Sequence, residues 1–316
     1  MQLHAASLGE AVPRENFEAQ IHSVFASAIN LRLAHEDRLI TVLISDHYEL
    51  PQGIRIATKA LSLQSLTVNL RAAARGGILR FDSSPLTVDL RGAPVWKCHV
   101  PELGMDMQSP AAQRGWTTAW DALNKGQRLK NTDIIAKDLF QAHVDSPLSQ
   151  RMSRFAMQLI ASAAQFDVEG SIHAAGKMIG LGPGVTPSGD DILVGFLTGL
   201  WSTAGQNQTR LSFIRAFGNS LMQIAKQTNE ISRTYLYHAT HGQFSSSLST
   251  LAESIATGGP VEKTMEASMQ VGHSSGMDSV TGLLIGLFVW NQDPPSPAGK
   301  EAGVRGIEVI GQLRKE

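Results

Sequence analysis

Cysteine is almost absent from this sequence of 316 residues, which contains only Cys98. A single cysteine excludes an intramolecular disulfide and argues against a cysteine-based metal cluster, and it fits a reducing compartment. An excess of charge is also missing, because 27 basic side chains are matched by 28 acidic ones, which leaves a formal net charge of −1. Since no basic stretch of the kind that binds nucleic acid is present, we expect no nucleic-acid partner.

Long apolar runs are missing as well. The longest, residues 280–290, is interrupted by two glycines and is too short to span a bilayer. The first residues include acidic side chains and no sustained apolar core, which argues against a secretory signal. We therefore expect a soluble, cytoplasmic protein with no membrane partner. The hydrophobic content of 42% is enough to bury a sizeable core, and the length favours two domains.

The first third of the chain has the pattern of a small β domain. It begins with a segment at residues 16–30 whose helical spacing indicates either an amphipathic helix or an irregular lead-in, closed by Asn30. Short β-rich runs follow, and because no helix-length segment separates them, we expect mostly antiparallel pairing. In the run at residues 60–70 the apolar positions switch from one face of the expected strand to the other, as they do at the bulges of small barrels. The expected strands cover residues 39–44, 54–57, 60–70, 78–81, 86–90 and 95–100.

Helical patterns dominate after a loop-like boundary that contains Gly104 and two prolines. We place the β-rich domain at residues 1–105 and a mainly helical domain at residues 106–316. The fold class is therefore α+β, a small antiparallel, barrel-like β domain followed by a mainly helical domain with an internal repeat. The expected helices cover residues 116–124, 132–143, 148–165, 173–178, 188–201, 211–225, 232–238, 247–256, 261–270 and 279–290.

A glycine-rich stretch, GLGPGVTPSGDD at residues 180–191, comes directly before an apolar helix. Its glycines allow positive φ and the close approach of a ligand, and Ser188 with Asp191 has the spacing of a capping box. No lysine follows the glycines, so a Walker-type phosphate loop is excluded. The free N–H groups of a helix start bind anions. The candidate substrate- and anion-binding residues here are Gly182, Gly184, Thr186, Ser188, Gly189 and Asp190.

The same helix start occurs twice in the chain. The sequence SGDD at 188–191 returns as SGMD at 275–278, and the glycines at 195 and 199 return at 282 and 286, always 87 residues later. Because glycines one turn apart leave room for another helix, we infer that the two helices cross through them and bring both helix starts to one side. Asp191, Asp278 and His273 are then candidate catalytic residues, and Ser275 and Gly276 join the binding residues.

The glycine-rich stretch and the sequence GHSSGMD at residues 272–278 resemble the hallmark motifs of the AllH-like proteins of bacteria. The sequence HSVFASAINL at residues 22–31 resembles that family too, and the resemblance extends over about residues 20–290. The sequence departs mildly from the family pattern at Ser274, where threonine is expected. The resemblance implies a subunit of oxamate carbamoyltransferase, an enzyme of allantoin and purine nitrogen catabolism. That activity transfers a carbamoyl group between oxalurate and phosphate, yields oxamate and carbamoyl phosphate, and requires other subunits of a hetero-oligomeric enzyme.

The residues themselves leave several roles open. Asp191 is either a capping acid or a substrate ligand, and Asp191 and Asp278 are candidates to share Mg²⁺ with phosphate oxygens. No other cofactor or metal is indicated. His273 is either solvated or an acid–base group for a carbamoyl nitrogen, and Lys177 and Arg233 are candidate cations for the anionic substrates.

Two alternatives to a carbamoyltransferase remain. One is a non-catalytic binding or scaffold subunit, and the other is a small-molecule hydrolase or lyase that uses the same anion pocket. In either case the partners expected are a small carboxylate or ureido compound and phosphate.

Overall fold

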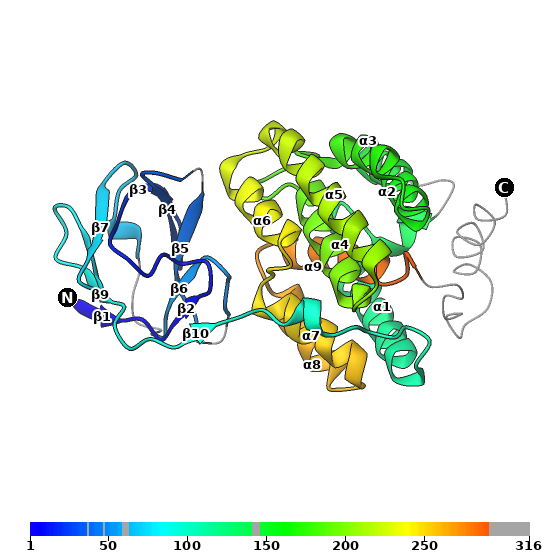
Figure 1. The fold of residues 1–316 in the computed structure, drawn as a ribbon, viewed down its shortest axis with the longest axis horizontal. Helices are drawn as coiled ribbons and strands as arrows, with labels where there is room; N and C mark the ends of the chain where they lie inside the picture. Colours follow the sequence, from blue (N-terminus) through cyan, green and yellow to red (C-terminus); the bar gives the residue numbers. More distant parts are fainter. Residues whose placement is uncertain (37, 47, 59–62, 141–145, 291–316) are drawn as a thin grey trace. The chain divides into compact units, whose positions relative to one another are not determined.

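The structure is a computed structural model of the chain that describes residues 1–36, 38–46, 48–58, 63–140 and 146–290. The chain divides into two compact units, Met1–Cys98 and His99–Glu316. A β-rich unit is followed by a helical one, which confirms the α+β class expected from the sequence (Figure 1).

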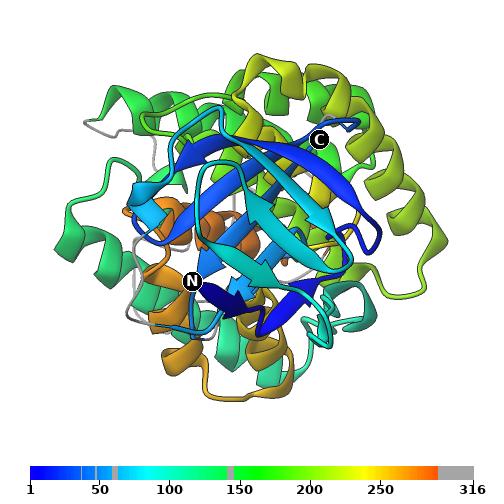
Figure 2. The same cartoon turned by 90° about the vertical axis from the view of Figure 1, so that its left-hand side faces the viewer.

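Figure 2 shows the strands of the β-rich unit. They form one mixed sheet with the strand order β1-β9-β8-β7-β3-β4-β5-β6-β2-β10. Most neighbouring strands pair antiparallel, as expected, whereas β1 with β9, β5 with β6, and β2 with β10 pair parallel. The strands are β1 (Gln2–His4), β2 (Ser7–Gly9), β3 (Phe17–Val24), β4 (Ala28–Leu33), β5 (Leu39–Ile44), β6 (Gly53–Ile56), β7 (Arg71–Arg75), β8 (Ile78–Phe81), β9 (Thr87–Asp89) and β10 (Val95–Trp96).

The core of this unit comes from alternate residues of its strands. In β3, Phe17, Ala19 and Ile21 are buried while the residues between them are exposed, which is the period of a strand with one buried face. The register of β3 against β4 shifts between Ile21 and Ser23. Such a bulge increases the local twist, so the sheet curls around its apolar side.

Two predictions for this unit are wrong. Residues 16–30 form β3 and the start of β4 rather than a helix. The positions of Phe17 and Ile21 fit both periods, and the pairing of β3 with β4 on one edge and with β7 on the other decides for the strand. Asn30 does not end a helix, because it lies buried in β4, where its side chain bonds two neighbouring hydroxyls.

The second error is the strand expected at residues 60–70, of which residues 60–62 lie outside the described residues. The remainder begins with the 3-10 turn η1 (Leu63–Ser65), and Leu63 and Leu66 are buried three residues apart, as such a turn requires. The other expected strands are confirmed as β5, β6, β8, β9 and β10, of which β10 is shorter than expected. Strands β1, β2, β3, β4 and β7 were not expected as strands.

The helical unit is arranged around α4, which is buried along its whole length and contacts α9, α6, α5, α7 and α3 (Figure 1). No helix in the described part of the chain is long and apolar enough to cross a membrane. The α-helices are α1 (Pro110–Lys130), α2 (Pro147–Ala164), α3 (Val168–Met178), α4 (Ser188–Ala204), α5 (Gln208–Ile224), α6 (Glu230–Thr240), α7 (Ser246–Thr257), α8 (Val261–Met269) and α9 (Ser275–Gly286). Short 3-10 turns are η2 (Val100–Glu102), η3 (Ala136–Phe140) and η4 (Ala225–Gln227).

The helix expected at residues 132–143 is wrong in its described part, which contains only η3. Its residues 141–143 lie outside the described residues. The backbone N–H groups of Ala136 and Lys137 donate to the side chains of Gln127 and Asn124 on α1. Side chains of another helix therefore take the donors that a longer helix would use for its own backbone.

The helical unit repeats a three-helix arrangement. Helices α2, α3 and α4 follow one another as α7, α8 and α9 do, and the first two helices of each copy are joined by equally short connections, residues 165–167 and 258–260. The loop before the third helix covers residues 179–187 in the first copy and residues 270–274 in the second. The repeat found in the sequence therefore extends to whole helices and gives α4 and α9 equivalent places.

We propose that the two units fold as separate domains, with the boundary near residue 105 that the sequence suggests. Lys97 is exposed and lies between β10 and η2. Within residues 1–290, brief trypsin digestion is expected to cut first after Lys97 and to give two fragments that keep their circular dichroism. Earlier cleavage inside α5, after Arg210 or Arg215, or loss of helical signal from the C-terminal fragment, would contradict separate folding.

Candidate functional site

Helices α4 and α9 cross in close contact through their repeated glycines. A Cβ on Gly195 would lie 2.7 Å from the backbone nitrogen of Leu283, and a Cβ on Gly282 would lie 2.7 Å from that of Phe196. Both would also clash with a carbonyl oxygen of the facing helix, so only glycine permits this approach. The crossing that the spacing predicts is confirmed.

The N-terminal ends of the two helices meet. The hydroxyl oxygens of Thr186, just before α4, and Ser275, the first residue of α9, lie 2.6 Å apart and share a hydrogen bond. Residues 186–191 and 274–278 are called the paired helix starts below. Both candidate halves of the site therefore lie together on one side of the helical unit, as the repeat predicts.

The glycine-rich loop has the backbone that its sequence predicts. Gly180, Gly182 and Gly184 have φ values of 70°, 118° and 93°. A Cβ on Gly182 would lie 2.9 Å from the backbone nitrogen of Ser188, whereas nothing lies within 4 Å of the same position on Gly184. The loop is therefore folded tightly against the start of α4 at Gly182 and is open at Gly184.

Two of the glycine amides expected to bind an anion are already used. The N–H of Gly189 donates to the carbonyl of Leu181 at 2.9 Å, and the equivalent N–H of Gly276 donates to the carbonyl of Val271 at 2.9 Å. These bonds close the loop before each helix in the same way. An anion at this site would therefore need donors other than these two amides, such as the hydroxyls of Thr186 and Ser275.

The capping-box interpretation of Asp191 is wrong. Helix α4 begins at Ser188, and its N-cap is Pro187, with no side-chain capping bond. A proline has no N–H, so Asp191 cannot complete a capping box with it. The backbone N–H of Asp191 instead donates to the carbonyl of Pro187 at 3.1 Å. The carboxyl of Asp191 therefore does not cap the helix.

Asp190 and Asp191 point in different directions. One carboxyl oxygen of Asp190 accepts the N–H of Gly180 at 2.9 Å, and the other accepts the hydroxyl of Thr228 at 2.6 Å. Burial raises the pKa of Asp190, and these hydrogen bonds, with the Ser232 hydroxyl, oppose the rise. Asp190 therefore positions the glycine-rich loop against the segment before α6 and is not placed to hold a ligand.

Asp191 points toward the second helix start. Asp191 is only 8% exposed, and its Oδ2 has no hydrogen-bond donor among the described residues. Burial raises the pKa of this carboxyl well above its usual range, and the negative charge of Asp278 adds to the rise. The hydroxyls of Ser275 and Thr186 act in the opposite direction.

Asp278 is the more deeply buried of the two, at 1% exposed, and neither of its oxygens has a hydrogen-bond partner in the described part of the chain. Burial raises the pKa of Asp278 to about 6. The hydroxyls of Ser188 and Ser274 lower it without making a hydrogen bond of normal geometry, and the charge of Asp133 raises it. Asp133 lies between α1 and η3, and nothing in its local sequence marks it as part of this site.

The paired helix starts thus hold buried carboxylate oxygens that have no hydrogen-bond donor among the described residues. Such oxygens destabilise the folded chain unless a ligand or an ion pairs with them. The positive ends of two helices favour the ionised carboxylates. They can accept hydrogen bonds from the N–H groups of an amide or ureido compound, or they can bind a cation. Among the described residues no group of three His, Cys, Asp or Glu side chains could hold a metal ion. A cation here would have two protein carboxylates, which suits Mg²⁺.

The remaining candidates are less closely connected to these carboxylates. His273 is exposed on the loop before α9, and Lys177 is exposed near the end of α3. Arg233 is half-buried on α6. Asn229, rather than its neighbour Thr228, caps α6 by accepting two backbone N–H groups. Thr228 instead belongs to the bonds that fix Asp190.

Two family models match the chain. One, described as oxamate carbamoyltransferase subunit AllH, matches residues 178–287. The other, described as the AllH family N-terminal domain, matches residues 3–95. The chain belongs to the AllH family. The first match begins at Met178, directly before the glycine-rich loop, and ends just after α9, so it contains both helix starts of this AllH-family chain. No solved structure matches the chain.

Proposed function

We propose that this chain is a subunit of a carbamoyltransferase that converts oxalurate and phosphate to oxamate and carbamoyl phosphate, with other subunits of the same enzyme. Its AllH family supports the role of a carbamoyltransferase subunit. The observation that supports a substrate site at the paired helix starts is the set of buried oxygens of Asp191 and Asp278 that lack a donor in the described residues.

Oxalurate has the groups that such a site requires. It carries a ureido NH₂, an N–H between two carbonyls, and a carboxylate. The carboxylate oxygens of Asp191 and Asp278 would accept its N–H groups, and whichever hydroxyl of Thr186 and Ser275 accepts their shared hydrogen bond would donate its own O–H to a carbonyl oxygen of the substrate. Because buried carboxylates that lack donors are costly, a ligand rich in N–H groups would be bound in preference to one that has only acceptors.

The transfer step needs one proton at the departing nitrogen. An oxygen of phosphate attacks the carbamoyl carbon, the bond from that carbon to the nitrogen retained by oxamate breaks, and this nitrogen takes up a proton to become an amide. Asp278, with a pKa of about 6, would be partly protonated near neutral pH and could supply that proton. Asp191 would hold the ureido group in place.

Two anionic substrates beside buried acids require neutralisation. Mg²⁺ between Asp191 and Asp278 would provide it and would also bind phosphate oxygens. A proton on one of the two carboxyls is the other arrangement that the raised pKa values support. An assay in EDTA, with and without added Mg²⁺, separates them, since only the first requires the cation.

The test measures carbamoyl phosphate formed from oxalurate and phosphate by the chain, alone and together with the other subunits of its complex. The complex is expected to be active, and Asp191→Asn is expected to reduce its rate by about 10- to 100-fold, through the loss of roughly 1.5–3 kcal/mol of charged hydrogen bonding. Asp121→Asn, an exposed aspartate on α1, is the matched control and should leave the rate unchanged.

The other functions give different results in the same assay. If the chain is a non-catalytic scaffold, Asp191→Asn leaves the rate of the complex unchanged. A hydrolase or lyase consumes oxalurate without phosphate and forms no carbamoyl phosphate. Either result would contradict the proposal.

A further inference from the structure

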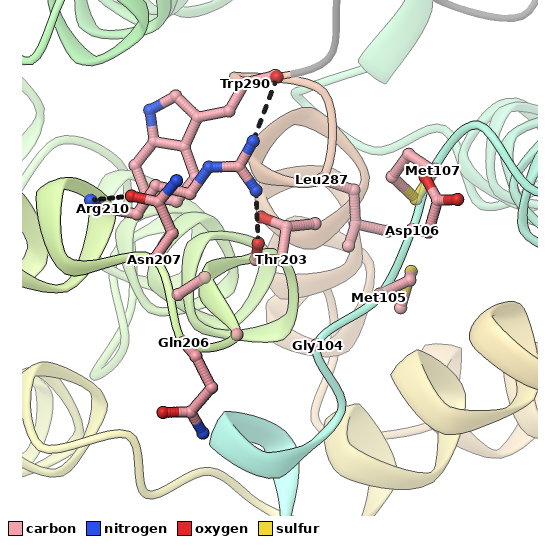
Figure 3. A pocket seen from close by; sticks show the side chains of 12 residues that line it. Gly104, Met105, Asp106, Met107, Thr203, Gln206, Asn207, Arg210, Leu287 and Trp290 are labelled. Carbon is pink, nitrogen blue, oxygen red and sulfur yellow. Dashed lines mark hydrogen bonds between the residues drawn. The ribbon is translucent and has the colours of Figure 1, made fainter.

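A cavity of about 280 Å³ lies at the opposite end of α4 from the paired helix starts (Figure 3). Its wall is formed by residues 104–107, by the turn from α4 to α5, and by Leu287 and Trp290 after α9. Helix α4 has 17 residues and therefore spans roughly 25 Å, at about 1.5 Å per residue. The cavity is thus a separate place in the helical unit, close to the smallest size of pockets that bind small organic molecules.

Arg210 provides the charge of this cavity. Its guanidinium lies in the wall, where Nη1 donates to the carbonyl of Thr203 at 2.6 Å and Nη2 to that of Trp290 at 3.5 Å (Figure 3). The guanidinium carbon is 5.2 Å from the centre of the Trp290 ring. These two bonds use only part of the N–H donors of a guanidinium. No acidic side chain pairs with Arg210 among the described residues.

The two carbonyls orient Arg210 but do not neutralise it. Arg210 is half-buried, so its charge is partly removed from water, and this burial lowers its pKa. A bound carboxylate would restore a counter-charge and would use the remaining donors in the bidentate geometry that arginine prefers. The guanidinium of Arg210 therefore has hydrogen-bond acceptors but no counter-anion among the described residues.

The remaining walls fit an organic anion. Helix α5 begins at the cavity with Asn207 as its N-cap, and its first turn has no acidic residue, so the positive end of its dipole is not compensated there. Asp106, the acid in the wall, is exposed and lies across the cavity from Arg210 (Figure 3). Met105, Met107, Leu287 and Trp290 provide apolar surface. We propose that this cavity binds a small organic carboxylate with a flat or apolar body.

Benzoate, which has this chemistry, and benzamide, its neutral counterpart of the same shape, are the probes. Isothermal titration of the full chain is expected to show binding of benzoate that is at least tenfold tighter than that of benzamide. Arg210→Gln should weaken benzoate binding at least tenfold. Three results would overturn the site. They are equal binding of the two probes, no binding at about 20 mM benzoate, and unchanged benzoate binding by Arg210→Gln. A charged hydrogen bond in a preformed cavity should give a dissociation constant below about 20 mM.

Asn207→Asp keeps the test decisive if loss of Arg210 unfolds α5. Aspartate caps a helix as well as asparagine does, so stability should be maintained, while the new carboxylate beside Arg210 should compete with benzoate and weaken its binding several-fold. Unchanged binding in this variant would also overturn the proposal. Asp191→Asn is the control for location and should leave benzoate binding unchanged. Loss of binding in that variant would place benzoate at the paired helix starts instead, and this result does not depend on whether carbamoyl transfer is observed.

Discussion

Asp278→Asn is expected to stabilise the folded chain by up to about 3 kcal/mol at pH 8 and to remove the activity proposed for the paired helix starts. Burial raises the pKa of this carboxyl from 3.8 to about 6, and each pKa unit corresponds to about 1.4 kcal/mol. Ionised Asp278 therefore destabilises the folded chain above pH 6. An amide carries no charge, and its N–H groups would lie close to the Asp191 carboxyl, whose charge now repels Asp278.

The sign of the pH dependence follows from the direction of the pKa shift. Because the folded-state pKa of Asp278 is above its unfolded value, its favourable contribution is complete below about pH 4 and is lost as the pH rises through about 6. The free energy of unfolding of the wild type should therefore fall, relative to that of Asp278→Asn, between about pH 4 and pH 7, and the difference should be constant above that range.

Urea unfolding of both proteins at pH 5, 6, 7 and 8 measures this difference, since the contributions of groups that do not interact with Asp278 cancel. Asp121→Asn, on the exposed face of α1, should show no such dependence. A difference between wild type and Asp278→Asn that stays constant from pH 5 to pH 8 would mean that the pKa of Asp278 in the folded chain is not raised above its unfolded value. The activity should be lost in this variant because an amide would present N–H donors to the N–H groups of the substrate.

The meeting of the two helix starts could be predicted from sequence because it depends on a repeat. Glycines at 195, 199, 282 and 286 occupy the same positions in two helices. A close crossing of the two helices explains why all four positions lack a side chain. That argument needs no knowledge of the loops. The crossing is parallel, with Gly195 against Leu283 and Gly199 against Leu287, and this direction places both N-termini on one side.

The division of roles between neighbouring aspartates could not be predicted in the same way. Asp190 and Asp191 have nearly identical surroundings in the sequence, and their directions are fixed by a loop that closes through Leu181 and Pro187. The partners that distinguish them, Thr228 for Asp190 and Asp278 for Asp191, come from distant parts of the chain. Residues that act through tertiary contacts leave no local pattern to recognise.

The same reason explains the errors in the β-rich unit. Phe17 and Ile21 are four residues apart, which suits a helix, but they are also two steps of a strand whose intermediate residue Ala19 is small and buried. Only the neighbours β4 and β7, brought together by the sheet, decide between the two periods. Short amphipathic segments are ambiguous until their partners are known.

Gly282→Ala should destabilise the helical unit by about 2 kcal/mol or more and separate the two helix starts. A Cβ at this position would clash with the carbonyl of Ile192 and lie 2.7 Å from the backbone nitrogen of Phe196. Backbone atoms cannot move aside as a side chain can, so α9 must shift away from α4, which costs about 1–3 kcal/mol or more in a packed core. Alanine favours a helix over glycine by about 1 kcal/mol, a gain smaller than this cost.

Gly176→Ala on α3 is the matched control. There a Cβ would lie 3.4 Å from the Cδ1 atom of Ile224, the end of a side chain that can adjust, so the variant should be as stable as the wild type or up to about 1 kcal/mol more stable. Urea unfolding gives both values. Separation of the helix starts should also admit water to Asp278, so Asp278→Asn should stabilise the Gly282→Ala protein by less than it stabilises the wild type. If Gly282→Ala is as stable as Gly176→Ala, the two helices do not cross through their glycines, and the carboxylates of Asp191 and Asp278 have no reason to share one site.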